Sequence, residues 1–283
     1  MRLRLIGAVL AGCGGLNLQA QAVRLEPAEQ LVREVVYNEL HDHAHHGAWR
    51  YWVTQGAGGA SRLEEQVETG DGPVARVVAA GGRPLSGAAL WSEQQRLDRL
   101  AHSSEEAERC HRSYTEDEQR MGRILALLPD AFAYEEGGEH DGMRELYFHP
   151  RADFPAHTVE ARIFHAMSGT LWIDERFKRL RRLDGKLEEN VDFGYGLLGR
   201  LYKGGWFRLE RARVSATDWK TVRLEIHMSG RALLLKTIAR ETSEVRGGFE
   251  PVPTGLTLAQ GLQMLGPQTG NAAELEAALK VNR

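Results

Sequence analysis

Apolar side chains recur with a helical period near the start of the chain and with a period of two after it. Leu31, Val35 and Leu40 are spaced as on one face of an α-helix. This stripe predicts a helix over 26–46. Apolar and polar residues then alternate, as they do along half-buried strands. The alternation predicts an antiparallel meander of strands at 49–54, 63–67 and 74–79.

A polar stretch over 86–128 follows, and its pattern is helical. We expect breaks in this helical stretch near Ser103 and Tyr114. Pro129 is expected to end it, because the residue before a proline is disfavoured in helical conformation.

From Phe132 onward the chain is rich in strand patterns. Gly137-Gly138 predicts a hairpin turn between two of these strands, and the glycines of 194–199 indicate a cluster of turns. Short helices are expected at 159–167 and 255–265. Helices followed by runs of strands predict an α+β domain with an antiparallel sheet. The further strands are expected at 170–174, 176–183, 187–193, 206–214, 222–229 and 232–240.

Composition narrows the class of protein. Hydrophobic residues make up 42% and charged residues 27% of 283 residues, which is typical of a folded chain and not of a disordered one. The formal charge of -3 gives no basic surplus for binding nucleic acid. We therefore expect no nucleic-acid partner. After the N-terminal segment no apolar run is long enough for a transmembrane helix.

The N-terminus is typical of a secretory signal. Arg2 and Arg4 precede a mostly apolar stretch from Leu5 to Leu18, and Ala20-Gln21-Ala22 is a small-x-small cleavage pattern. We expect residues 1–22 to be a signal peptide, and the protein to be periplasmic or secreted. The folded domain is then expected over 23–266, followed by a flexible tail over 267–283.

A second interpretation of the same segment remains open. Leu10-Ala11-Gly12-Cys13 matches a lipobox, in which Cys13 becomes the lipidated first residue of a membrane-anchored lipoprotein. Only residues 1–12 would precede that cut, which is short for a charged region plus an apolar region. After either cleavage the mature chain would hold no transmembrane span.

The segment from Leu146 to Lys236 resembles the periplasmic lipoprotein-sorting proteins of the LolA/LolB-like class, most of all its exported relatives without an assigned function. The resemblance implies a curved antiparallel sheet forming a half-open β-barrel, covered by helices, with an apolar concave face that holds acyl chains. The helical stretch over 86–128 is an insertion relative to that pattern. The resemblance is carried by Phe148-His149-Pro150, Met167–Asp174, Arg179-Leu180, Leu183–Leu187, Val191–Gly196 and Lys203–Phe207.

Four large apolar residues in this segment are candidates for binding a hydrophobic or lipidated ligand: Leu171, Trp172, Trp206 and Phe207. Strand alternation places Leu171 and Trp172 on opposite faces, and likewise Trp206 and Phe207. A sheet with aromatic residues on both faces needs cover on both, or a ligand on one. The sequence does not say which face is used.

The only dense basic stretch holds Arg179, Arg181 and Arg182. These side chains are candidates for contact with acidic lipid headgroups or with an acidic envelope protein. The alternative is a charged edge strand, on which such residues prevent pairing with another sheet.

We expect a non-catalytic protein without cofactor or metal. No nucleophile elbow, phosphate loop or dinucleotide fingerprint is present. Four histidines at 41, 43, 45 and 46 match no metal-binding motif and fit a solvated helix end. The alternatives are an envelope protein-interaction or sensor domain that uses the same sheet, and a hydrolase whose site has no recognisable motif.

The export prediction can be tested by mass. Intact-mass analysis of protein recovered from the cell envelope should show a chain that begins at Val23, or a lipid-modified chain that begins at Cys13. Recovery of only the full-length chain, from the cytoplasm, would contradict both interpretations.

Overall fold

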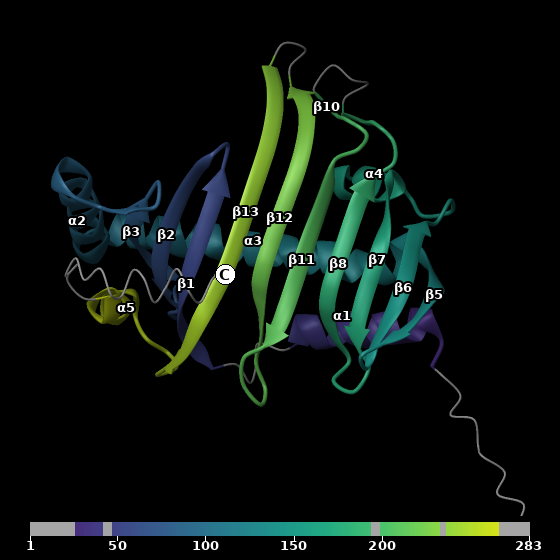
Figure 1. The fold of residues 1–283 in the computed structure, drawn as a ribbon, viewed down its shortest axis with the longest axis horizontal. Helices are drawn as coiled ribbons and strands as arrows, with labels where there is room; N and C mark the ends of the chain where they lie inside the picture. The colour runs from purple at the N-terminus through teal and green to yellow at the C-terminus, as the bar shows by residue number, and fades with distance from the viewer. Residues whose placement is uncertain (1–25, 42–46, 194–198, 233–235, 266–283) are drawn as a thin grey trace, which may run out of the picture.

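The computed structural model describes residues 26–41, 47–193, 199–232 and 236–265, and side chains at all of these except 232–240 (Figure 1). The helices are α1 (Ala28–His41), α2 (Gly87–His102), α3 (Ser104–Ala131), α4 (Val159–His165) and α5 (Leu258–Leu265). The first six strands are β1 (Ala48–Ala57), β2 (Ala60–Val67), β3 (Val74–Ala80), β4 (Arg83–Pro84), β5 (Phe132–His140) and β6 (Met143–Pro150). The others are β7 (Met167–Asp174), β8 (Arg179–Leu187), β9 (Val191–Phe193), β10 (Gly199–Leu201), β11 (Trp206–Arg213), β12 (Trp219–Ala232) and β13 (Lys236–Val252).

The described strands form one thirteen-stranded sheet in which every pairing is antiparallel. Its order is β4-β3-β2-β1-β13-β12-β11-β8-β7-β6-β5, with β10 beside β12 and β9 beside β10. The predicted α+β class with a large antiparallel sheet is confirmed. The end strands β4 and β5 do not pair with each other, so the described sheet is not closed.

One face of the sheet, here called the helix side, packs against α1, α3 and α4. The apolar stripe of α1, which includes Leu31 and Val35, is buried against Leu146, Leu171 and Ile173 of the strands. Residues at alternate strand positions point to the opposite face, here called the outer face. The main core therefore lies between α1 and strands β5 to β8.

Helices α2 and α5 pack against the end of the sheet that β2 and β3 form. Leu258 and Leu265 of α5 and Leu100 of α2 form a second core with Val67 and Val74. Helix α2 also covers the free edge of β3: the backbone N–H of residue 77 donates to a Glu93 carboxylate oxygen at 2.8 Å, and Arg96 donates to the carbonyl of residue 75 at 2.6 Å. Covering the edge provides hydrogen-bond partners for backbone groups that could otherwise pair with a strand of another chain.

The long polar stretch is helical as predicted, but one of its two expected breaks is wrong. The break at Ser103 is confirmed, because the Ser103 hydroxyl accepts a hydrogen bond from the Glu106 N–H and caps α3. No break occurs at Tyr114, where α3 continues and Tyr114 donates to Glu118 one turn later at 2.6 Å. The helix also continues for two residues past Pro129.

The hairpin predicted at Gly137-Gly138 turns later in the chain. Those glycines lie in a bulge within β5, and the turn falls at Asp141 and Gly142. Both turn residues have positive φ, 52° and 72°. An Asp-Gly pair in this conformation matches the right-handed twist of a two-residue hairpin, which a bulge in mid-strand does not.

Adjacent residues of β6 provide a test of the two faces. Leu146 is fully buried on the helix side, whereas Tyr147 is exposed. Leu146→Ala should lower the free energy of unfolding by about 2–5 kcal/mol, because it leaves a cavity in the main core. Tyr147→Ala, the matched control, should cost less than about 1 kcal/mol. Urea denaturation measures both, and equal losses would contradict the assignment of the faces.

Candidate functional site

Five leucines face one another across five neighbouring strands on the helix side. Leu146 pairs with Leu171, Leu171 with Leu183, Leu183 with Leu209, and Leu209 with Leu224. We call this set the leucine row. Leu146 and Leu171 are buried, whereas the other three are only half-buried. The cover over this face is therefore complete at one end of the row and incomplete at the other.

A second apolar pair lies beside the leucine row. Phe207 of β11 faces Ile226 of β12, and both side chains are half-buried. Phe207 lies over Gly185 of β8, where any side chain would collide with its ring. Glycine at this position lets the ring lie against the backbone, which extends the apolar surface onto β8.

Helix α3 crosses this face of the sheet (Figure 1). Near its end, Ile124, Leu127 and Leu128 pack on the main core. Between His111 and Met121, however, every residue except Thr115 is exposed, and Met121 is 55% exposed. A helix that lay flat on a sheet would bury one stripe. The middle of α3 therefore bridges over the sheet, and the half-buried leucines beneath it remain accessible.

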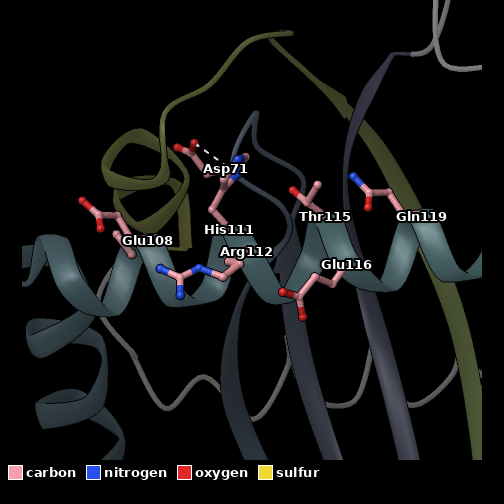
Figure 2. Close-up of a pocket in the computed structure, with 8 residues that line it drawn as sticks. Asp71, Glu108, His111, Arg112, Thr115, Glu116 and Gln119 are labelled. Atoms are coloured by element: carbon pink, nitrogen blue, oxygen red, sulfur yellow. Dashed lines mark ion pairs between the residues drawn. The ribbon is translucent and has the colours of Figure 1, made fainter.

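A polar hollow of about 560 Å³ lies where α3 passes the β2–β3 turn and α5 (Figure 2). His111 points at Asp71, with 3.7 Å between Nδ1 and Oδ1, whereas Glu116 points away. The other Asp71 carboxylate oxygen accepts a hydrogen bond from the Leu258 N–H at 3.4 Å. The histidine and the aspartate are both about half exposed, and such pairs contribute little energy. This hollow is a place where α3, the β2–β3 turn and α5 meet.

The four candidate ligand-binding residues do not come together. Leu171 and Phe207 lie on the helix side, Leu171 within the main core. Trp172 and Trp206 lie on the outer face, where Trp172 lies beneath the Arg182 guanidinium at 4.6 Å and Trp206 stacks on His227. The alternation predicted this separation, and the helices decide which pair lies near an apolar surface.

The basic stretch is divided in the same way. Arg179 is buried, donates to the carbonyl of Asn38 at 3.0 Å and lies 3.5 Å from the Glu39 carboxylate. Arg181 lies over Trp219 at 5.4 Å. Strand β8 pairs with β7 on one side and β11 on the other, so the edge-strand interpretation is wrong. The three arginines therefore lie on a strand within the sheet and not on its edge, and each contacts a specific partner.

A network of ion pairs covers the outer face opposite the leucine row. Asp184 accepts from Arg182 at 2.5 Å and from Arg208 at 3.1 Å, and Arg223 lies 3.6 Å from Glu210 and 3.3 Å from Glu225. Burial alone would raise the pKa of Asp184, but the two guanidiniums more than offset burial, and its pKa is below the ordinary value.

Sequence reasoning identified Leu171 but missed the other four leucines of the row, although a signal for three of them was present. Arg182-Leu183-Asp184, Arg208-Leu209-Glu210 and Arg223-Leu224-Glu225 repeat one pattern of cation, leucine and acid. Their antiparallel register places each arginine opposite an acid and each leucine opposite a leucine. The pattern identifies the strands, but only the register shows that the three segments are neighbours.

Several sequence predictions fall on residues outside the described ranges: the signal peptide, the lipobox with Cys13, the tail over 267–283, and the histidines at 43, 45 and 46. His41 is described, and its ring stacks on Tyr37 with centroids 4.0 Å apart. Within the described ranges, no three His, Cys, Asp or Glu residues are grouped as metal ligands would be. In the same part of the chain, no helix combines the length and apolar character needed to span a bilayer.

Comparison of the chain with protein-family models, with curated proteins and with solved structures finds no match.

Asp184 provides a test of the outer-face network. Because its pKa is lowered on folding, Asp184 contributes stability above the unfolded pKa of about 3.9, and this stability is lost as the pH falls through the folded pKa. Asp184→Asn should lower the free energy of unfolding by about 1 kcal/mol at pH 7. The difference from the unmodified protein should shrink at pH 3. Urea denaturation at both pH values measures it, and a constant difference would contradict an electrostatic origin.

Proposed function

We propose that the protein is a non-catalytic binding or carrier protein for an apolar or amphiphilic ligand, such as a lipid or the acyl chains of a lipoprotein. The observation that carries the proposal is the bridging course of α3 above a half-buried leucine row. Half-buried apolar side chains at the margin of a core, as Leu183 and Leu209 are, are typical of ligand-binding surfaces. A chain of methylene groups can occupy such a surface without needing hydrogen bonds.

The length of the apolar surface sets the affinity that we expect for a ligand. A ligand lying across β8, β11 and β12 covers two strand spacings, or about 10 Å. Each buried CH₂ contributes about 0.8 kcal/mol before the costs of ordering are deducted. The end of the row toward Leu171 is closed by the main core, so the ligand would enter from the side of β13. Micromolar affinity corresponds to about 8 kcal/mol and requires more than about ten buried methylene groups, so only a long acyl chain is expected to bind this tightly.

The resemblance to the LolA/LolB-like class supports the same proposal, and so does the secretory pattern of the N-terminus. We infer that the protein acts outside the cytoplasm, either released or anchored through Cys13. In that setting the sheet would curve around the ligand as a half-open barrel. Its insertion, which forms α2 and α3, would contribute to the helical cover over the ligand.

A substitution in the leucine row tests the proposal. Leu224→Asn should weaken binding of a fluorescent long-chain fatty acid about ten-fold, because it removes half-buried apolar surface from the site. Val245→Asn is the matched control: Val245 is also half-buried, on the neighbouring strand, but it pairs with Arg223 on the outer face. Fluorescence titration measures the two affinities.

The control should bind as the unmodified protein does. If a folded sample binds no fatty acid, or if both substitutions have the same effect, the leucine row is not the site. Circular dichroism and thermal unfolding of each variant show that a loss of binding is not a loss of folding.

The alternative is recognition of another envelope protein by the outer face. Trp206 and Tyr147 are large exposed side chains there, Trp206 38% exposed, and aromatic residues are common in protein interfaces. The charges around them are paired within the chain, which leaves less to attract a partner. Loss of a partner on Trp206→Ala, in a sample that binds no fatty acid, would favour this alternative.

A further inference from the structure

The leucine row continues into polar residues on the next strands. Leu224 of β12 pairs with Glu244 of β13, Glu244 with Gln55 of β1, and Gln55 with Arg62 of β2. Pairing keeps these side chains on the helix side. One continuous track therefore changes from buried leucine to half-buried leucine to charged groups, at right angles to the strands.

Two ion pairs lie at the polar end of this track. The Arg246 guanidinium donates to Glu244, two residues away on β13. The Arg62 guanidinium lies 2.6 Å from the Glu64 carboxylate, two residues away on β2, and donates to the Gln55 side-chain oxygen at 2.9 Å. Arg246 also lies over the ring of Tyr51 at 5.9 Å. Burial raises the pKa of Tyr51, so its hydroxyl stays neutral beneath the cation.

The two signs of charge are not equally accessible. The side chain of Arg62 is 51% exposed while that of Glu64 is 6% exposed, and Arg246 is 33% exposed while Glu244 is 14% exposed. The carboxylates therefore lie beneath and orient the guanidiniums, and the guanidiniums face the space beside the row. A molecule that enters from the side of β13 therefore meets the guanidiniums before it reaches the leucines.

We propose that the ligand is an anionic amphiphile, whose tail lies on the leucine row and whose oxyanion head, a carboxylate or a phosphate, pairs with Arg246 and then Arg62. This proposal rests on the proposed function. A guanidinium has five N–H donors, and the described hydrogen bonds use a single nitrogen of Arg246 and of Arg62. The planar guanidinium fork matches both carboxylate and phosphate oxygens.

The geometry places the head at a suitable distance from the tail. Arg246 is on β13, the strand next to Leu224, and strand spacing is about 4.8 Å. An oxyanion beside Arg246 therefore leaves the following methylene groups above Leu224, Leu209 and Leu183 in turn. Because Arg246 and Arg62 are each balanced by a carboxylate, the cluster should hold one monoanion or dianion and not a longer polyanion.

Four twelve-carbon probes test the head: dodecanoate, dodecyl phosphate, dodecanol and dodecyltrimethylammonium, each below its micelle concentration. Displacement of a fluorescent fatty acid at pH 8 measures their affinities for the full mature chain. Dodecanoate and dodecyl phosphate should bind about ten-fold more tightly than dodecanol. The ammonium probe should bind most weakly. The advantage of the anions should fall at 0.5 M salt, because salt screens partly exposed charges.

Arg246→Gln should abolish the advantage of the anions and leave dodecanol unchanged, and Arg246→Lys should retain part of it. Arg223→Gln is the matched control, because Arg223 is 37% exposed and pairs with an acid two residues away, but on the outer face. The comparison between dodecanoate and dodecyl phosphate distinguishes the two head chemistries.

The outcomes separate the two proposals. If all four probes bind equally and Arg246→Gln changes none of them, the head inference is wrong while the carrier function stands. If not even dodecanol binds a folded sample, the carrier function itself is wrong. If Arg223→Gln weakens the anions as much as Arg246→Gln, the effect is one of net charge and the assignment to the polar end of the track is overturned.

Discussion

The structure depends on the register of three Arg-Leu-acid segments at the centre of the sheet. In β8, β11 and β12 the leucine of each segment points to the helix side and the two charges point to the outer face. Antiparallel pairing then places arginine opposite acid on every neighbouring strand, which stabilises each cross-strand pair by about 0.2–1 kcal/mol. A slip of one residue would move all three leucines to the charged face. The same register therefore builds the apolar surface and the network of ion pairs behind it.

The two faces of these strands have different consequences. On the outer face, Arg208 lies 3.1 Å from Asp184 and 3.9 Å from Glu225, so these charges have partners within the chain. On the helix side, leucine has no such internal partner and requires cover. Helix α1 and the end of α3 supply that cover over β5 to β8. Leu209 of β11 packs at the margin of this core, and Leu224 of β12 lies beyond it.

The length of α3 explains why the cover stops there. Its 28 residues span about 42 Å, enough to reach from the core around α2 and α5 to the core around α1. Both ends of the helix are held in those cores, so its middle crosses the intervening strands whether or not it packs on them. The sequence of that middle is polar apart from Tyr114 and Met121, which suits a bridge over the candidate site better than a fixed lid.

Much of this organisation follows from local sequence. Alternation in Trp49–Val53, the cap at Ser103 and the stripe of α1 each depend on residues close together, and the helices and strands that they predict are present. The hairpin at Asp141-Gly142 was misplaced because two turn signals, Gly-Gly and Asp-Gly, lie within six residues of each other. Predicting Tyr114 as a break failed because nothing at that position prevents a helix.

The candidate site was decided by tertiary structure. The sequence alone determined that Trp172 and Leu171, or Trp206 and Phe207, face opposite ways, because successive strand side chains must alternate. It could not determine which face the helices cover, because that choice depends on contacts between residues more than a hundred positions apart, such as Asn38 with Arg179. Nor could it show that Leu224 and Glu244 are neighbours, because strand order and register arise from the packing of the whole sheet. Which side chains of a strand share a face is therefore local information. The neighbourhood of the apolar track and its charged end arises only when the whole sheet folds.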